Sequence, residues 1–510
     1  MRSTQRRLTV PVPGGLAACA VLLAAACGAP TGDPTAAQPT AVSNAPEPGR
    51  YAAAAIDAAT WIRSTAVTTE HGAAWPADPY DTASVATSLY TGTPGVVLFF
   101  VELAEYTGDA GYLNDARAGA DFLLARLEGG GQRVNGETGE PVPDGTMQNA
   151  GLYTGLAGIG FVLHETYRAT GDTRYRDGAR RAVALIHEQA RETGSGVDWI
   201  ESTDIISGSA GTGLFLIWAA DRMDDPASIE LAKRAGYRLI EVAERHDTGL
   251  GWRVNPEYPR LMPNFSHGTA GVAYFLADLY EGTGEQAFLD AAVAGGERLL
   301  ALAETEGDIC LVFHHTDGGE ELQYLSWCHG PAGTARTFYK LWQVTGDQRW
   351  LEWTGKAANG VYASGIPETL TEGFWNNVGQ CCGSAGVAEF AMALHGAGVE
   401  LPASTQRATT GGGDGASSGA AAQAGGASAT ATSPHLAFAR RTADNLLARA
   451  TQDAGGLMWI QAEHRVQPDF LVAQTGYMQG AAGIGMMLLH LDALIEGRPS
   501  PRIVFPDAPY

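Results

Sequence analysis

Short, almost entirely apolar stretches recur along the chain, and each one opens at a pair of closely spaced glycines. Clear examples are residues 96–103, 159–163, 212–218, 272–276 and 484–491. A helix that is apolar on all sides is buried rather than lying on the surface, so these stretches predict inner helices. The glycines before them permit tight backbone turns and close helix approach.

The glycine pairs form a Gly-x-x-Gly motif that occurs seven times. Its copies begin at Gly92, Gly155, Gly208, Gly268, Gly330, Gly383 and Gly480. Successive copies are 53 to 63 residues apart, except the last interval of 97 residues. A fixed period of this length is the signature of a repeat architecture.

A second, more amphipathic helix is expected after each apolar one. Its entry repeats as Thr-Gly-Asp followed by an aromatic residue, at Thr107, Thr170 and Thr345, with a looser copy at residues 282–289. The Asp can cap the new helix, and the aromatic residue can dock it on its neighbour.

Seven pairs of inner and outer helices can stack as an open solenoid or close into a ring. Closure is favoured because all inner helices are equally apolar and no polar capping repeat is present. The predicted fold is therefore all-α, an (α/α)7 toroid with the glycine motifs gathered at one end of the ring.

The long last interval contains residues 403–434, which are nearly all Gly, Ala, Ser and Thr. Such a segment cannot bury a core, so we expect a disordered insert between the sixth inner helix and the final pair. The toroid is expected to span residues 51–510 around it.

The N-terminus resembles a bacterial lipoprotein signal. Basic residues at positions 2, 6 and 7 precede a short apolar run that ends in small residues before Cys27. We expect residues 1–26 to be removed, Cys27 to be lipidated, and residues 27–50 to form a flexible tether. The protein is then exported and held at the outer face of the cell membrane; plain secretion is the alternative.

Composition and charge limit the classes of partner that the protein is expected to bind. The chain has 510 residues, 45% of them hydrophobic, and a formal net charge of −23. Such an acidic chain does not favour phosphate backbones, so nucleic acid is not an expected partner. We expect a monomer with a well-solvated surface.

Four cysteines follow the signal: Cys310, Cys328, Cys381 and Cys382. Three of them stand directly before the fifth and sixth glycine motifs, as Asp204 and His267 do before the third and fourth, so a closed ring places all five on one rim. Thiolates are soft ligands that suit Zn²⁺, and three ligands with one open position mark a catalytic site. A disulfide is the usual alternative in an exported protein, but adjacent cysteines make strained bridges.

These motifs resemble those of the lanthionine synthetase C-like family, the cyclases of lanthipeptide biosynthesis. The resemblance covers residues 50–510 apart from the insert. It implies a seven-hairpin toroid with a zinc ion on its rim, held by Cys328 and Cys381, with Cys382 where the family usually has His. It also matches Asp204 and His267 to the family's Asp and His near the metal.

Two positions depart from the family pattern: His329 replaces a Tyr after the first cysteine, and Tyr324 replaces an Arg. The activity implied by the resemblance is addition of a zinc-activated thiol to a dehydrated Ser or Thr, on a peptide or small-thiol substrate. Asp204, His267 or His329 then moves the protons or holds the enolate.

Other interpretations stay open. The zinc can be purely structural, Asp204 can be only a helix cap, and His267 only a hydrogen-bonding residue at a helix entry. Cys310 is expected to be a small buried residue, and His314 and His315 a loop pair. Whole-protein alternatives are a thiol- or peptide-binding protein without turnover, and a carbohydrate-active toroid, which needs two neighbouring carboxylates.

Overall fold

The computed structural model describes residues 48–81, 85–129, 132–134, 141–370, 377–402, 433–461 and 472–510. All of them belong to one unit of the chain, Pro46–Tyr510. The expected signal peptide, Cys27 and most of the expected tether lie outside these ranges, and so do residues 403–432 of the expected insert.

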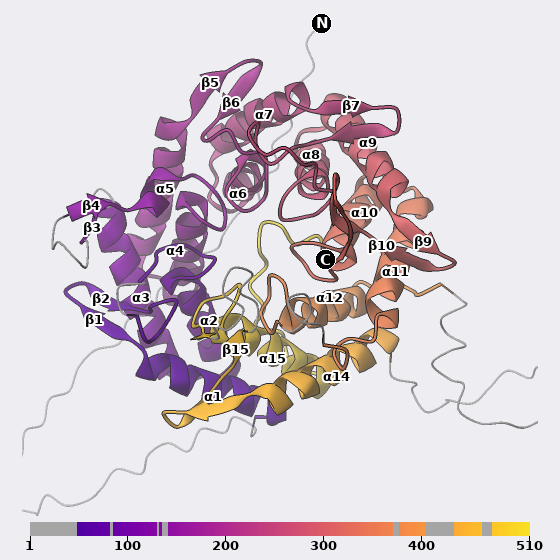
Figure 1. Ribbon diagram of the computed structural model, residues 1–510. Coiled ribbons are helices and arrows are strands. Elements are labelled where there is room, and N and C mark those ends of the chain that lie inside the picture. Colours follow the sequence, from indigo (N-terminus) through magenta and orange to yellow (C-terminus); the bar gives the residue numbers. More distant parts are fainter. Residues whose placement is uncertain are drawn as a thin grey trace, which may run out of the picture. The chain divides into compact units, whose positions relative to one another are not determined.

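Seven inner helices surround a common axis, and each begins directly after the first glycine of a motif (Figure 1). They are α2 (Thr93–Thr107), α4 (Leu156–Thr170), α6 (Ser209–Arg222), α8 (Thr269–Thr283), α10 (Pro331–Thr345), α12 (Ser384–Gly396) and α15 (Ala481–Glu496). Residues 93–103 of α2 and 481–493 of α15 are buried without a break. The prediction of apolar inner helices is confirmed, because such sequences have no face to show to water.

An outer helix packs along each inner one, which gives seven pairs. The outer helices are α3 (Ala110–Glu128), α5 (Thr173–Gln189), α7 (Pro226–Glu241), α9 (Gln286–Leu302), α11 (Gln348–Ala363), α14 (Pro434–Arg449) and α1 (Arg50–Ser64). This arrangement confirms the expected all-α toroid.

The expected position of the last outer helix is wrong. No helix follows α15, whose outer partner is α1 from the start of the unit. Helix α14 is the outer partner of α12, so the insert falls inside the sixth pair and not before a final one. The N-terminal helix thus covers the last repeat, and the ring closes without a polar cap.

The repeated Thr-Gly-Asp entry works as a helix stop followed by a helix start. The glycine ends the inner helix at φ of 69° to 71°, a region that favours glycine. The Asp side chain then accepts a hydrogen bond from the backbone N–H two residues later, in α3, α5 and α11. The aromatic residue three positions after each Asp is buried, which confirms its expected docking role.

The second glycine of a motif is required by close backbone approach. A Cβ on Gly333 would collide with the carbonyl oxygen of Trp327, and one on Gly386 with that of Gln380. The loop before each inner helix therefore folds back over the first turn of that helix, which only glycine allows.

Short antiparallel hairpins follow most outer helices, and the sequence patterns did not signal them. The strand pairs are β1 (Val67–Thr69) with β2 (Gly72–Ala74), β3 (Gln132–Val134) with β4 (Pro141–Pro143), β5 (Arg191–Thr193) with β6 (Gly196–Asp198), β7 (Glu244–His246) with β8 (Gly249–Gly251), β9 (Glu304–Glu306) with β10 (Ile309–Leu311), β11 (Phe313–His315) with β12 (Gly319–Gln323), β13 (Thr451–Asp453) with β14 (Gly456–Met458), and β15 (Ile460–Gln461) with β16 (Val472–Ala473). A 3-10 helix, η2, covers Gly145–Gln148.

Four of these hairpins are fixed to their outer helix in the same way. A buried tryptophan follows the second strand and donates from Nε1 to a backbone carbonyl oxygen 13 residues earlier, at 2.7 to 3.0 Å. The tryptophans are Trp75, Trp199, Trp252 and Trp459. The indole buries a large apolar surface while its one polar atom is satisfied.

A closed ring of backbone hydrogen bonds joins the seven loops before the inner helices. From donor to acceptor it runs Tyr90 to Tyr153, Tyr153 to Ile206, Ile205 to Ser266, Ser266 to Cys328, Cys328 to Cys381, Cys381 to Met478, and Met478 back to Tyr90. The N···O distances are 2.9 to 3.1 Å. Each loop is thereby held in register with its neighbours, and their side chains converge on one rim of the ring.

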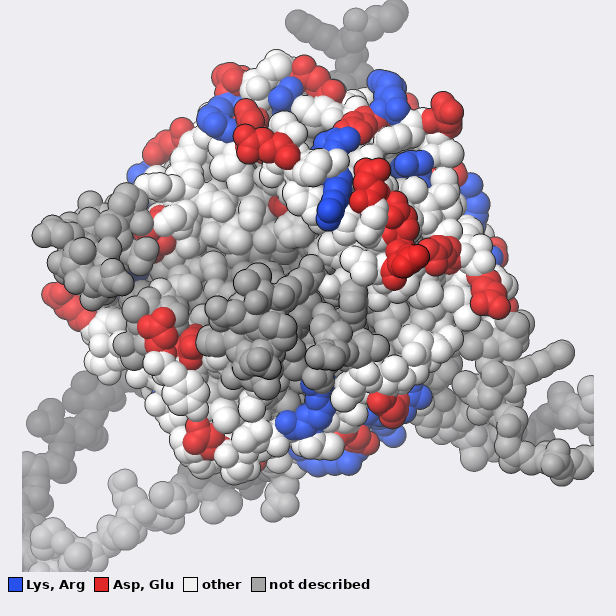
Figure 2. Space-filling view, in the orientation of Figure 1, with Lys and Arg blue, Asp and Glu red and all other residues white. Residues whose placement is uncertain are grey.

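Charged side chains on the face shown in Figure 2 lie mainly toward its outer edge, with acids and bases interspersed. The C-terminus lies near the centre of the ring (Figure 1). Within the described ranges, none of the helices is both long and apolar enough to cross a bilayer.

Candidate metal centre

The hydrogen-bonded ring of loops carries the predicted metal ligands and catalytic residues, whereas Cys27 lies outside the described residues. Cys328 and Cys381 are members of the ring, and the backbone N–H of Cys328 donates to the carbonyl of Cys381 at 3.0 Å. His329 and Cys382 come directly after them, and His267 follows Ser266 of the same ring. Two motifs 53 residues apart are thus brought side by side by the closure of the fold.

The three sulfur atoms form one cluster. Cys382 Sγ lies 2.7 Å from Cys328 Sγ and 3.3 Å from Cys381 Sγ, and all three lie within 4.8 Å of one another. These cysteines are free, since a disulfide would need a separation near 2.05 Å. Three thiols converging on one point fit the donor set of a soft metal ion such as Zn²⁺.

Burial and mutual hydrogen bonding set the charge of the cluster. Burial raises the pKa of Cys328, but hydrogen bonds with the other two thiols and the electrostatic effect of the neighbouring His329 imidazole leave that pKa well below its ordinary value. Burial and the bond with Cys328 raise the pKa of Cys381, and bonds with both other thiols raise that of Cys382. A metal held by all three sulfurs would displace the protons that they carry.

Two hydroxyl groups that sequence reasoning missed contact the sulfur atoms. Tyr90, from the first motif, donates from its hydroxyl to Cys381 Sγ at 2.9 Å. Ser326 Oγ lies 3.3 Å from Cys328 Sγ. A possible signal for Tyr90 was its position two residues before the first glycine of its motif. Cys328 and Cys381 occupy the same position in their own motifs.

Asp204 and His267 form a tight pair beside the sulfurs. Asp204 Oδ2 lies 2.5 Å from His267 Nδ1, and Asp204 Oδ1 accepts from the backbone N–H groups of Ser207 and Gly208 at 2.8 and 2.7 Å. Asp204 is therefore more than a cap of α6. Burial lowers the pKa of His267, but the Asp204 carboxylate raises it by more, so the net pKa lies above its ordinary value.

His329 is 8% exposed, and among the described residues neither of its ring nitrogens has a hydrogen-bond partner. Its ring stacks on that of His314 with centroids 4.2 Å apart, and lies 5.9 Å from the His267 ring. A buried, unpaired imidazole costs free energy unless a bound molecule satisfies it.

The expectation of a loop pair at His314 and His315 is wrong. Both residues lie in strand β11 and are buried. Their Nδ1 atoms are 2.8 Å apart, and His315 Nε2 lies 2.8 Å from a guanidinium nitrogen of Arg260. The hairpin β11–β12 therefore packs beside His329 through the ring of His314. Cys310 is fully buried in β10, as expected, and burial raises the pKa of its thiol to about 12.

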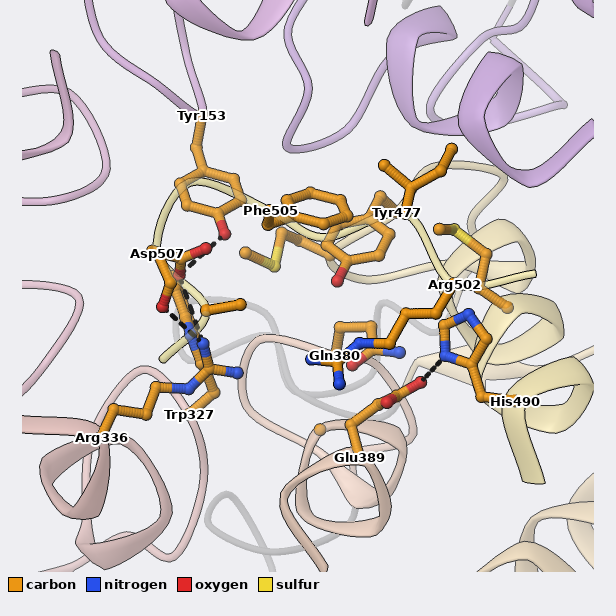
Figure 3. A pocket seen from close by; sticks show the side chains of 15 residues that line it. Tyr153, Trp327, Arg336, Gln380, Glu389, Tyr477, His490, Arg502, Phe505 and Asp507 are labelled. Carbon is orange, nitrogen blue, oxygen red and sulfur yellow. Dashed lines mark hydrogen bonds and ion pairs between the residues drawn. The ribbon is translucent and has the colours of Figure 1, made fainter. Parts of the chain in front are cut away.

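A small cavity of about 40 Å³ lies between α10, α12, α15 and the C-terminal tail. Figure 3 shows Arg336, Glu389, His490, Arg502 and Asp507 pointing into it. Trp327 and Gln380, the residues directly before two of the cysteines, also line it. Its size is far below the 300–1,000 Å³ of ordinary small-molecule sites.

The tail is held in the ring by buried polar contacts. Glu102 Oε1 accepts from the backbone N–H of Ile503 at 2.7 Å, and Glu102 Oε2 pairs with His490 at 2.8 Å. Tyr153 donates to Asp507 at 3.1 Å, and Arg336 donates to the Asp507 backbone carbonyl at 2.9 Å. The tail thus fills the axis behind the loops that carry the cysteines.

Nisin cyclase has a similar structure, with a TM-score of 0.54 and 14% identity over 86% of this chain and 92% of nisin cyclase. At that identity the likeness concerns the fold. Two carbohydrate-active proteins resemble the chain less: the α-1,6-mannanase GH76A of Salegentibacter sp. HEL1_6 (TM-score 0.39, 16% identity, 63% and 89% covered) and cellobiose 2-epimerase from Bacillus thermoamylovorans B4167 (0.41, 12%, 59% and 83%).

No curated protein matches the chain significantly. The model of the family described as "Lanthionine synthetase C-like protein" matches residues 83–397, which is more than half of the chain. The matched region includes the first six glycine motifs, the three cysteines, Asp204 and His267. The chain therefore belongs to the lanthionine synthetase C-like protein family.

Proposed function

We propose that the protein is a zinc-dependent enzyme that adds a thiol to a dehydroamino acid, or to a similar electrophile, in a peptide. The observation that carries this proposal is the convergence of three free sulfurs and the Asp204–His267 pair on one rim of the ring. Family membership supports the same reading, since nisin cyclase shares the fold.

Cys328, Cys381 and Cys382 would hold the ion and leave one position open for the substrate thiol. When bound, Zn²⁺ supplies the Lewis acidity that lowers the pKa of that thiol and leaves a nucleophilic thiolate. Cys382 is half-buried while the other two cysteines are buried, so its side of the cluster is the one that an incoming thiol meets.

The chain's own residues move the protons. The substrate loses the S–H proton, its sulfur bonds to the β-carbon of the dehydro residue, and the α-carbon takes up one proton. His267 suits the last step, because Asp204 holds its Nδ1 and raises the pKa of the ring, which leaves Nε2 to donate. His329, buried with both ring nitrogens unpaired, suits the first step or the binding of the neighbouring carbonyl.

The substrate thiol is carried by a peptide or by a small molecule, and the enzyme acts as a monomer. We also propose that it works outside the cell membrane, anchored through a lipid on Cys27. Labelling with a radioactive fatty acid tests the anchor: wild type should incorporate label and Cys27→Ala should not. Release of wild type into the medium without label would favour plain secretion.

The activity is tested with a synthetic peptide that contains one dehydroalanine and one cysteine. The reduced, zinc-loaded protein should consume the free thiol without a mass change, and Cys328→Ala should not. A control peptide with alanine in place of dehydroalanine should keep its thiol. Saturable peptide binding without thiol consumption would instead favour a binding protein. The absence of both binding and turnover would refute the proposal.

One pair of neighbouring buried acids does not favour the carbohydrate-active alternative. Glu102 and Glu389 flank His490, at 2.8 and 2.6 Å from its ring nitrogens. Glu389 lines the cavity of about 40 Å³, which has no room for a sugar ring.

A further inference from the structure

Tyr90 reaches the candidate metal centre from the opposite end of the sequence. Its hydroxyl lies 2.9 Å from Cys381 Sγ, although the two residues are 291 positions apart. The backbone fixes this approach: Met478 donates its N–H to the carbonyl of Tyr90 and accepts from the N–H of Cys381. The closed ring therefore holds the backbones of Tyr90 and Cys381 at the separation that this contact needs.

With the proposed metal bound, Cys381 is a thiolate, and the contact is that of a donor facing an anionic acceptor. A tyrosine hydroxyl, whose ordinary pKa is about 10, keeps its proton at neutral pH and can donate to the sulfur. A hydrogen bond to a thiolate withdraws electron density from the sulfur and stabilises its charge. Such contacts around first ligands tune a metal site, and their loss typically costs 10- to 100-fold in metal affinity.

We propose that Tyr90 is a positioning residue of the metal centre: its hydroxyl holds Cys381 Sγ and sets how much charge that sulfur gives to the metal. This inference rests on the proposed zinc site. A shell of three thiolates is electron-rich, and the Tyr90 hydrogen bond reduces the charge that one of the three gives to the metal.

The ring supplies a matched control. Tyr153 occupies the same position in the second motif, two residues before Gly155, and takes part in the same backbone ring. Its hydroxyl donates to Asp507 and not to a sulfur. Tyr90→Phe and Tyr153→Phe therefore remove the same atom from equivalent positions, but only the first change alters the surroundings of the cluster.

Cobalt substitution gives the readout. Wild type titrated with Co²⁺ should show sulfur-to-cobalt charge-transfer absorption in the near ultraviolet. Tyr90→Phe should move these bands to longer wavelength, because a sulfur without its hydrogen bond gives up an electron more easily. Its Zn²⁺ affinity, measured against a competing chelator, should fall about 10- to 100-fold with stoichiometry retained. Tyr153→Phe should match wild type in both measurements.

A second substitution keeps the test decisive if Tyr90→Phe folds poorly. Site-specific 3-fluorotyrosine at position 90 is a stronger donor and should move the bands to shorter wavelength. Unchanged spectra and affinity in a folded Tyr90 variant, beside a wild type that shows the bands, would overturn this inference and leave the zinc site standing. A wild type without charge-transfer bands would refute the zinc site itself.

Discussion

The carboxylate of Asp204 lies 2.5 Å from the imidazole Nδ1 of His267, across two loops that are 63 residues apart in the chain. The pair sits on the same rim as three converging cysteines. Its geometry fixes one nitrogen of His267 and leaves the other for a substrate, which is the arrangement of a positioned acid or base.

Asp204→Asn keeps the shape of the side chain and removes its charge. We expect thiol-addition turnover to fall by about 10²- to 10⁴-fold, because His267 loses the carboxylate that orients it and raises its pKa. Zinc content should not change, since Asp204 is not a ligand. Asp198→Asn, which alters a buried acid paired with Arg191 at 2.8 Å, is the control and should retain turnover. Equal rates for both variants would remove Asp204 from the mechanism.

Replacing the second glycine of a motif should affect stability differently from replacing a glycine outside the motifs. Gly333→Ala drives a Cβ into the Trp327 carbonyl and should lower the free energy of unfolding by about 1–3 kcal/mol. Gly396→Ala lies at the end of α12 with no atom within 4 Å of the new Cβ, and should raise it by about 0.4–1 kcal/mol. Denaturant unfolding of both variants checks this, and a neutral Gly333→Ala would show that the loops do not pack this closely.

His490 predicts a pH dependence of stability. Burial lowers its pKa, but the carboxylates of Glu102 and Glu389 outweigh this and raise the pKa to about 10. A group whose pKa is raised by folding stabilises the folded state when it is protonated. This stabilisation is complete below the ordinary His pKa of about 6.5 and is lost as the pH rises through 10. His490→Gln should cost about 3–5 kcal/mol near neutral pH, where it leaves two acids unpaired.

The difference in unfolding free energy between wild type and His490→Gln should then shrink between about pH 7 and pH 10. Urea unfolding at several pH values measures it. His71→Gln, at an exposed His that lies 3.9 Å from Glu70, is the control and should cost little at any pH. A cost for His490→Gln that stays constant across this range would contradict the assigned charges.

Asp507 anchors the tail in the ring. Asp507→Ala leaves the buried Arg336 without its 3.6 Å charge partner, and should destabilise the fold by about 3–5 kcal/mol. Asp221→Ala removes an exposed acid from a pair with Arg222 and should cost at most about 1 kcal/mol. Thermal unfolding compares the two, and equal stability would mean that the tail is not held by this pair.

Much of the fold was predictable because its constraints are local. Gly330, at a φ of 113°, and Gly333, which lies against the Trp327 carbonyl, are both dictated by the turn that starts α10. Closure of the ring then places Cys328 beside Cys381, because both occupy the same position in adjacent motifs. The spacing of the motifs was therefore enough to predict that the sulfurs converge.

The rest depends on contacts that leave no local signal. Helix α1 carries no glycine motif, so its role as partner of α15 could not be read from its own sequence. The contact between Tyr90 and Cys381 and the stacking of His314 on His329 both need the closed ring or the added hairpin to form. The tail that fills the axis has no repeat to mark it.

Metal content of the reduced protein tests the central claim most directly. Wild type loaded with Zn²⁺ and freed of excess ion should retain one zinc per chain by elemental analysis. Cys310→Ala, which alters the buried cysteine outside the cluster, should retain it too. Cys328→Ala and the double variant Cys381→Ala, Cys382→Ala should lose it. A wild type without zinc, or cluster variants that bind it as well as wild type does, would contradict the account.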